Sequence, residues 1–149
     1  MGYSYGEPII VKTTAKGWVV VVTSGYNNGM NSGDSGCDGL GHLYVLNPKT
    51  GDLIKDIPTT GCTTTPTSSP CGLAEISAYV ANSDVDNTVD YVYGGDLYGN
   101  VWRFDLTGSK SNGWGVSNFA TLKDATGATQ PITAAPELTS ISGARMVFV

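Results

Sequence analysis

Oxygen-bearing side chains occupy every second position of one short stretch of the sequence. They are Asn82, Asp84, Asp86, Thr88 and Asp90. Alternate oxygens in a tightly wound loop converge on one point, as they do at the start of an EF-hand loop. Three carboxylates held this close together would repel one another unless a hard cation neutralised them. The spacing therefore predicts a Ca²⁺ site.

Other positions in the same stretch also match the EF-hand pattern. Asn87 stands at the sixth position, where an EF-hand loop uses Gly for a sharp turn, and Asn tolerates left-handed backbone better than most residues. Thr88 would offer its backbone carbonyl, and Asp90 would replace the distant Glu in a shortened loop. The alternative is a solvated turn whose Asn and Asp side chains hydrogen-bond to their own backbone.

The three cysteines bear on the compartment. Cys62 and Cys71 bracket a polar stretch with two prolines. Such a segment has no apolar surface to bury, so a disulfide would replace the missing core; two free thiols at the ends of a loop are the alternative. Cys37 would then either form a disulfide with a cysteine outside this chain or remain a free thiol. This use of cysteine favours an exported protein.

Catalytic arrangements are not evident. The single histidine, His42, stands at the start of an expected strand, where we expect a structural role. Residues 94–99 are rich in Gly but lie between expected strands, so they lack the helix of a phosphate-binding loop. The cysteines and the histidine also lack the close ligand pairs of zinc motifs. The sequence therefore predicts no catalytic residues and no enzyme activity.

The elements that must position the acidic stretch are short β-strands. Gly accounts for 20 of 149 residues and charged residues for 14%, against usual shares of roughly 7% and 25%. Apolar runs are rich in Val, Ile and aromatic residues, and helical spacing is missing. Expected strands cover residues 7–11, 18–24, 42–46, 53–57, 91–96, 100–106, 136–139 and 144–149, with shorter apolar runs at 73–80 and 119–122.

The order of these elements repeats. Residues 41–47 match residues 99–105, and after Pro136 the spacing to an apolar run echoes that after Pro8. A period of roughly 40–60 residues with four short strands per unit is typical of propeller blades. We therefore expect an all-β chain, a β-propeller fragment of about two four-stranded antiparallel blades plus the start of a third. The expected blades cover about 7–80 and 81–135, with the next starting at 136–149. A β-sandwich is the alternative.

Charge and hydropathy exclude two classes of partner. The net charge is −5 with a pI near 4.5, and basic residues are scattered. A protein that binds a phosphate backbone needs a concentrated basic surface, so we expect no nucleic-acid partner. The longest apolar run, residues 18–22, is far shorter than the ~18 residues of a membrane helix, so we expect no transmembrane segment.

The run from Asp90 to Leu106, DYVYGGDLYGNVWRFDL, resembles a signature of one family. This family comprises the PilY/PilC-type proteins of bacterial type IV pili, which are tip-associated adhesins and biogenesis factors. In their C-terminal β-propeller, an acidic loop runs directly into such a stretch. Residues 43–47 with Thr50 and Gly51 resemble the preceding blade, and residues 25–28 resemble its strand exit. The resemblance covers roughly residues 7–107.

The resemblance implies a function for the acidic stretch. In that family the loop binds calcium, and its occupancy is linked to pilus extension and retraction. Carried over by position, the ligands would be Asn82, Asp84, Asp86, the Thr88 carbonyl and Asp90. Asn82 departs from the family, which usually has Asp there, so calcium binding is expected to be weaker. The resemblance further implies an exported, cell-surface or pilus-associated protein active in adhesion, whose partners are type IV pilus components and a host or abiotic surface.

Two other functions remain as alternatives. Residues 44–51 also resemble blades of quinone-cofactor (PQQ-type) dehydrogenases, but such an enzyme needs a complete propeller, an axial cofactor and a catalytic acid, which we do not identify here. The other alternative is an unrelated propeller that binds carbohydrate or protein. For any propeller fragment we expect contact with remaining blades, or self-association through open edge strands.

Overall fold

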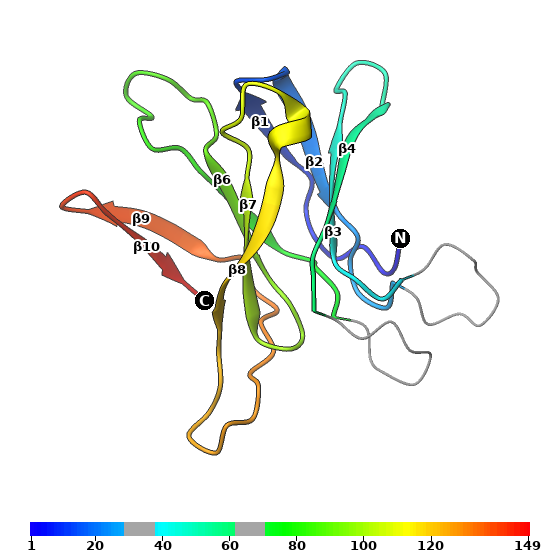
Figure 1. The fold of residues 1–149 in the computed structure, drawn as a ribbon, viewed down its shortest axis with the longest axis vertical. Helices are drawn as coiled ribbons and strands as arrows, with labels where there is room; N and C mark the ends of the chain where they lie inside the picture. The colour runs from blue at the N-terminus through cyan, green and yellow to red at the C-terminus, as the bar shows by residue number, and fades with distance from the viewer. Residues whose placement is uncertain (29–37, 62–70) are drawn as a thin grey trace.

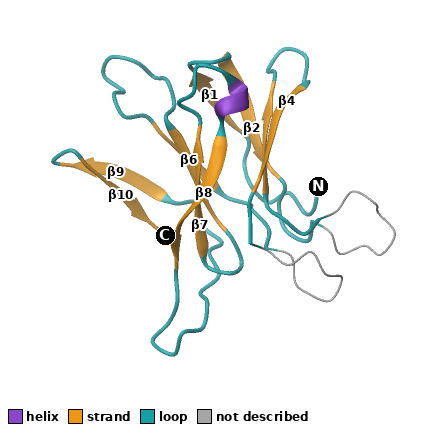
Figure 2. Cartoon of the chain, in the orientation of Figure 1, coloured by secondary structure: helices purple, strands orange, loops and turns teal. Residues whose placement is uncertain are grey.

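The computed structural model describes residues 1–28, 38–61 and 71–149, and these residues form antiparallel β-sheets (Figure 1). Figure 2 shows strands joined by loops, with one short helical turn, η1 (Ser111–Gly113). In the part of the chain that the structure describes, no helix is long and apolar enough to span a membrane. The expected all-β architecture is confirmed.

The described strands form two four-stranded sheets and one hairpin. The first sheet contains β1 (Ile9–Thr13), β2 (Gly17–Thr23), β3 (His42–Leu46) and β4 (Leu53–Pro58) in that spatial order. The second sheet contains β5 (Ile76–Tyr79), β6 (Tyr91–Gly95), β7 (Asn100–Asp105) and β8 (Gly115–Thr121). The hairpin contains β9 (Glu137–Ile141) and β10 (Ala144–Phe148). Two blades followed by the start of a third are the arrangement that the repeat predicts.

The sheets differ from the expected blades in where they begin and end. The first sheet ends at Pro58, and Ile76 already pairs with Gly94 of the second sheet, whereas the sequence placed the boundary near residue 80. Because β5 pairs with β6, the acidic stretch is the connection of a hairpin within one sheet (the green loop at the upper left of Figure 1). The eighth strand also begins earlier than its apolar run, at Gly115.

The main hydrophobic core lies between the first and second sheets. Alternate residues of β2 and β3 are fully buried on one face because side chains of a strand point to opposite sides in turn. The second sheet contributes Val92, Trp102 and Phe104 to the same core. Burying one such side chain stabilises the fold by about 1.5–3 kcal/mol. The two sheets are therefore joined face to face.

The opposite face of the second sheet packs on the β9–β10 hairpin. Tyr93, Val101 and Ile132 form this smaller core, with Leu138 and Val147 against it. The first sheet has no such cover on its other face, where Ile10 and Trp18 are 66% and 58% exposed. Among the described residues, the second sheet is thus covered on both faces and the first sheet on one.

A tight turn around Asp96 connects β6 to β7. Asp96 is fully buried, and its Oδ1 accepts the N–H groups of Tyr98 and Asn100 at 2.8 and 2.9 Å. Its Oδ2 accepts from Asn100 Nδ2 at 2.9 Å and from Trp102 Nε1 at 2.8 Å. Gly99 has a φ of 76°, a backbone conformation that favours glycine. One carboxylate therefore organises the whole turn.

Candidate functional site

The acidic stretch forms an exposed loop between β5 and β6. Its first turn is closed by the backbone, since the N–H groups of Val85 and Asp86 donate to the Asn82 carbonyl at 3.1 and 2.8 Å. Asn82, Asp84 and Asp86 are exposed, whereas Thr88 and Asp90 are half-buried. All five residues predicted as ligands therefore lie on one loop, with the two C-terminal ones nearer the sheets.

The exit of the loop attaches to both sheets. Thr88 forms a parallel bridge with Lys12 of β1, and the Val89 N–H donates to the Lys12 carbonyl at 2.7 Å. Val89 is 1% exposed and belongs to the main core. Within the second sheet, Asp90 Oδ2 accepts the Ala81 N–H at 2.7 Å. The loop is thus held between the first and second sheets.

Asp86 has the most contacts of the loop's carboxylates. Its Oδ1 accepts from the Thr88 hydroxyl at 2.7 Å, from the Thr88 N–H at 3.1 Å and from Lys12 Nζ at 3.2 Å. These hydrogen bonds, the Thr88 hydroxyl first and the Lys12 ammonium next, lower the pKa of Asp86 below its ordinary value. Asp86 is therefore ionised at neutral pH and already lies beside a positive charge.

The loop's carboxylates do not converge. Among residues 1–28, 38–61 and 71–149, no three side chains of His, Cys, Asp or Glu form a group able to hold a metal ion. Like charges repel, and Lys12 together with backbone and hydroxyl donors satisfies Asp86 separately from Asp90. The oxygen-only donor set suits a hard cation such as Ca²⁺. Convergence of these oxygens on one ion therefore stays a prediction.

Lys12 contacts the acidic loop, and this contact was not predicted from the sequence. It lies 74 positions before Asp86, in a strand of the other sheet, and no local pattern marks it. The pairing of β5 with β6 brings the loop beside β1, so only the packing of the sheets reveals this contact. A search for isolated basic residues near predicted acidic loops would have found many candidates besides Lys12.

The predicted disulfide falls partly outside the described residues. Cys71 is buried, at 1% exposure, and is disulfide-bonded. Cys62 and Cys37 lie outside the described ranges. The pairing of Cys62 with Cys71 therefore stays a prediction.

Comparison with known proteins gives one family. The model of the PilY1 β-propeller domain matches residues 1–149. A type IV pilus biogenesis factor PilY1 homolog from Xylella fastidiosa is 34% identical over 78% of this chain, and PilY1 of Pseudomonas aeruginosa PAO1 is 30% identical over 93%. The chain spans 8% and 12% of the length of these two relatives. The crystal structure of the P. aeruginosa PilY1 C-terminal domain superposes with a TM-score of 0.79 at 28% identity, covering 99% of this chain and 32% of that one.

Proposed function

Because this chain belongs to the PilY1 β-propeller family, we propose that it is a non-enzymatic, calcium-binding propeller segment of a type IV pilus biogenesis protein. The relatives are named as pilus biogenesis factors, and the chain matches a small part of each. These matches favour the pilus protein over a quinone-cofactor dehydrogenase or an unrelated ligand-binding propeller. Type IV pilus components, and a host or abiotic surface for adhesion, are the proposed partners. An exported location at the cell surface or on the pilus follows from such a role.

The calcium proposal is carried by the placement of the predicted ligands on one exposed loop between two sheets. Asp86 is ionised at neutral pH, as a carboxylate ligand must be, and Ca²⁺ would replace the Lys12 ammonium that now pairs with it. Asn82, Asp84, Asp86, the Thr88 carbonyl and Asp90 are the residues that would hold the ion. When bound, Ca²⁺ supplies a divalent charge that neutralises the loop's carboxylates.

The same placement supports a role in tuning pilus extension and retraction. Lys12 is on the first sheet and Asp86 is on a loop of the second, so their ion pair bridges the two sheets. Both side chains are about half exposed, so the ion pair by itself adds little stability. A cation that binds Asp86 in place of Lys12 breaks this ion pair, and it thereby changes a contact between two blades. Calcium occupancy would in this way alter the contact between the two neighbouring blades.

We expect Asp86→Ala to abolish calcium binding. The chelator-treated chain is titrated with Ca²⁺ by calorimetry and its melting temperature is followed, with Mg²⁺ as a control ion. A hundredfold excess of calcium over the Kd should stabilise the wild-type fold by about 2.7 kcal/mol, and the variant should gain nothing. Asp105→Ala is the matched control, because Asp105 accepts the same pair of bonds from Thr107 but lies outside the loop.

Two results would count against the proposal. Absence of heat and of a melting shift up to millimolar calcium in the wild-type chain removes the calcium site. If binding is lost in Asp86→Ala but pilus-dependent motility of cells carrying this change in the full-length protein is normal, the site stands and its role in extension and retraction does not.

Asn82→Asp is expected to tighten calcium binding. It restores the charge that the family usually has at the first ligand position, and the number of ligand charges tunes the affinity of such loops. The same calorimetric titration should show a lower Kd than the wild-type chain. An unchanged Kd would mean that residue 82 does not contribute a side-chain ligand.

A further inference from the structure

The first sheet contains a second copy of the turn that Asp96 organises. Residues 38–44 and 96–102 align at the offset of the blade repeat. In the first copy, Asp38 Oδ1 accepts the Leu40 N–H at 3.0 Å, as Asp96 Oδ1 accepts the Tyr98 N–H. In both copies the carboxylate also contacts the side chain four residues on. That side chain is His42 in the first sheet and Asn100 in the second.

Each copy continues across the sheet to a third polar side chain. In the second sheet, Asn118 of β8 donates its Nδ2 to Asn100 Oδ1 at 3.0 Å. In the first sheet, Asp56 of β4 occupies the corresponding register position, since Tyr44 pairs with Asp56 as Trp102 pairs with Asn118. Asp56 Oδ1 lies 2.8 Å from His42 Nδ1. The two triads therefore share one layout and differ in chemistry.

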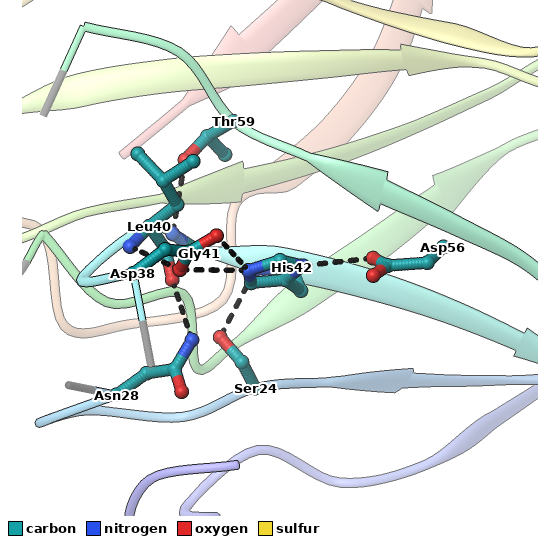
Figure 3. Close-up of polar contacts among 8 residues, drawn as sticks. All are labelled: Ser24, Asn28, Asp38, Leu40, Gly41, His42, Asp56 and Thr59. Atoms are coloured by element: carbon teal, nitrogen blue, oxygen red, sulfur yellow. Dashed lines mark hydrogen bonds and ion pairs between the residues drawn. The ribbon is translucent and has the colours of Figure 1, made fainter. Parts of the chain in front are cut away.

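The chemical difference lies in the middle residue. Asn100 donates through its amide nitrogen to Asp96 and accepts through its amide oxygen, so its contacts need no proton exchange. His42 lies between two carboxylates, with Nε2 at 3.0 Å from Asp38 Oδ1 and Nδ1 at 2.8 Å from Asp56 Oδ1 (Figure 3). A neutral imidazole carries one N–H and can donate to only one of them. Both contacts are hydrogen bonds only when the ring is protonated.

The surroundings of the ring hold it in this position. The His42 side chain is 11% exposed, whereas those of Asp38 and Asp56 are each 40% exposed. On β3 itself, the Tyr44 ring stacks on the imidazole with centroids 5.5 Å apart. From the end of β2, the Ser24 hydroxyl accepts the His42 backbone N–H at 3.0 Å. Within the described residues, the charged groups facing the imidazole are therefore Asp38 from the preceding turn and Asp56 from β4.

We propose that His42 is a proton-operated clasp, which ties the Asp38 turn to β4 when the ring is charged and releases one of the two as the pH rises. The second triad, built on Asn100, is the permanent form of the same connection. The clasp is at the opposite end of the first sheet from the acidic loop, because Lys12 pairs with Trp18 at the start of β2, whereas Thr23 at the end of β2 pairs with Leu43, the neighbour of His42. It is therefore independent of the proposed calcium site.

The electrostatics agree with this assignment. Burial alone would lower the pKa of His42, but hydrogen bonds to Asp38 and Asp56 and the attraction of both carboxylates outweigh burial and raise the pKa above 6.5. Burial alone would raise the pKa of Asp38, but the hydrogen bonds from His42 and from the Leu40 N–H outweigh burial and lower this pKa below its ordinary value. The stabilisation from His42 is therefore complete below pH 6.5 and lost as the pH rises through the raised pKa. The contribution of Asp38 is lost when the pH falls through its lowered pKa.

The test uses the fact that the chain has a single histidine. Its imidazole signals in an NMR titration belong to His42, so the pKa is measured directly. We expect a pKa above 6.5 in the wild-type chain, lowered in Asp56→Asn, with each unit of change equal to a tenfold shift in the protonation equilibrium. Asp105→Asn, which removes a carboxylate at the end of β7 in the second sheet, should leave the His42 pKa unchanged.

A second measurement connects the titration to stability. The double variant His42→Asn with Asp56→Asn copies the triad of the second sheet into the first. The melting temperature of the wild-type chain should fall from pH 6 to pH 9 relative to this variant, whose own profile should lack that component. A His42 pKa at or below 6.5, or identical pH profiles of the two proteins, would overturn the proposal.

Discussion

Asp96→Ala is expected to lower the free energy of unfolding by about 3–5 kcal/mol, because it leaves the buried indole N–H of Trp102 and three partly buried N–H groups without an acceptor. Asp96 is fully buried and accepts four hydrogen bonds, one of them from the indole N–H of Trp102. An unsatisfied buried donor costs about 1–3 kcal/mol, and water reaches the Asn100 side of the turn more easily than Trp102. The decrease in the free energy of unfolding should therefore be large, but smaller than four times the cost of one unsatisfied buried donor.

Urea unfolding of Asp96→Ala and of Asp105→Ala measures this difference. Asp105 also ends a strand region and also accepts a backbone N–H and a hydroxyl, from Thr107, but its turn is exposed. Asp105→Ala should lower the free energy of unfolding by less than about 1 kcal/mol. If the two variants unfold at similar urea concentrations, the turn is not organised by the Asp96 carboxylate.

Phe104→Ala is expected to destabilise the fold by about 3–5 kcal/mol, the usual cost of removing a buried aromatic ring. Phe104 is 0% exposed and lies in the core between the first and second sheets. The cavity would lie directly between the two blades, so their association should weaken together with the fold. Chemical denaturation followed by tryptophan fluorescence reports the change, since Trp102 and Trp114 belong to the same core.

Phe119→Ala provides the comparison for the same chemical change. Phe119 is on β8, is 48% exposed and contacts the Tyr93 ring edge-on at 5.5 Å. Its removal should cost about 1 kcal/mol, the contribution of one aromatic pair. Equal destabilisation by the two Phe variants would mean that the first and second sheets do not share a core.

Strand positions were predictable where apolar runs are bounded by turn residues. The third strand has the predicted bounds, residues 42–46, because Gly41 precedes it and the Asn47–Pro48 turn follows it. β8 begins at Gly115, ahead of its apolar run, since an edge strand gains its hydrogen bonds from β7 whatever its own composition. The grouping of β5 with the second sheet was not readable from composition, because it depends on pairing with β6.

The candidate sites differ in how far the sequence reveals them. Alternate oxygens locate the acidic loop, but the role of Lys12 depends on packing between sheets. For His42 a structural role is predicted, and its two carboxylate partners come from a turn and from a neighbouring strand. The repeat did hold a signal, since Asn100 and His42 occupy equivalent positions after equivalent aspartates. Comparing the repeats for differences, in addition to similarities, would have identified it.

The open face of the first sheet has a geometric consequence. Tyr44 and Leu46 stand on it at the positions that Trp102 and Phe104 occupy in the second sheet, where the first sheet covers them. Each blade therefore presents one kind of face to the blade before it and another to the blade after it. Contacts between unlike faces are heterologous, and repeating them in one direction either closes a ring or continues as a filament. In a propeller the chain itself supplies the successive units, so the polarity of its sheets is what allows closure without a two-fold axis.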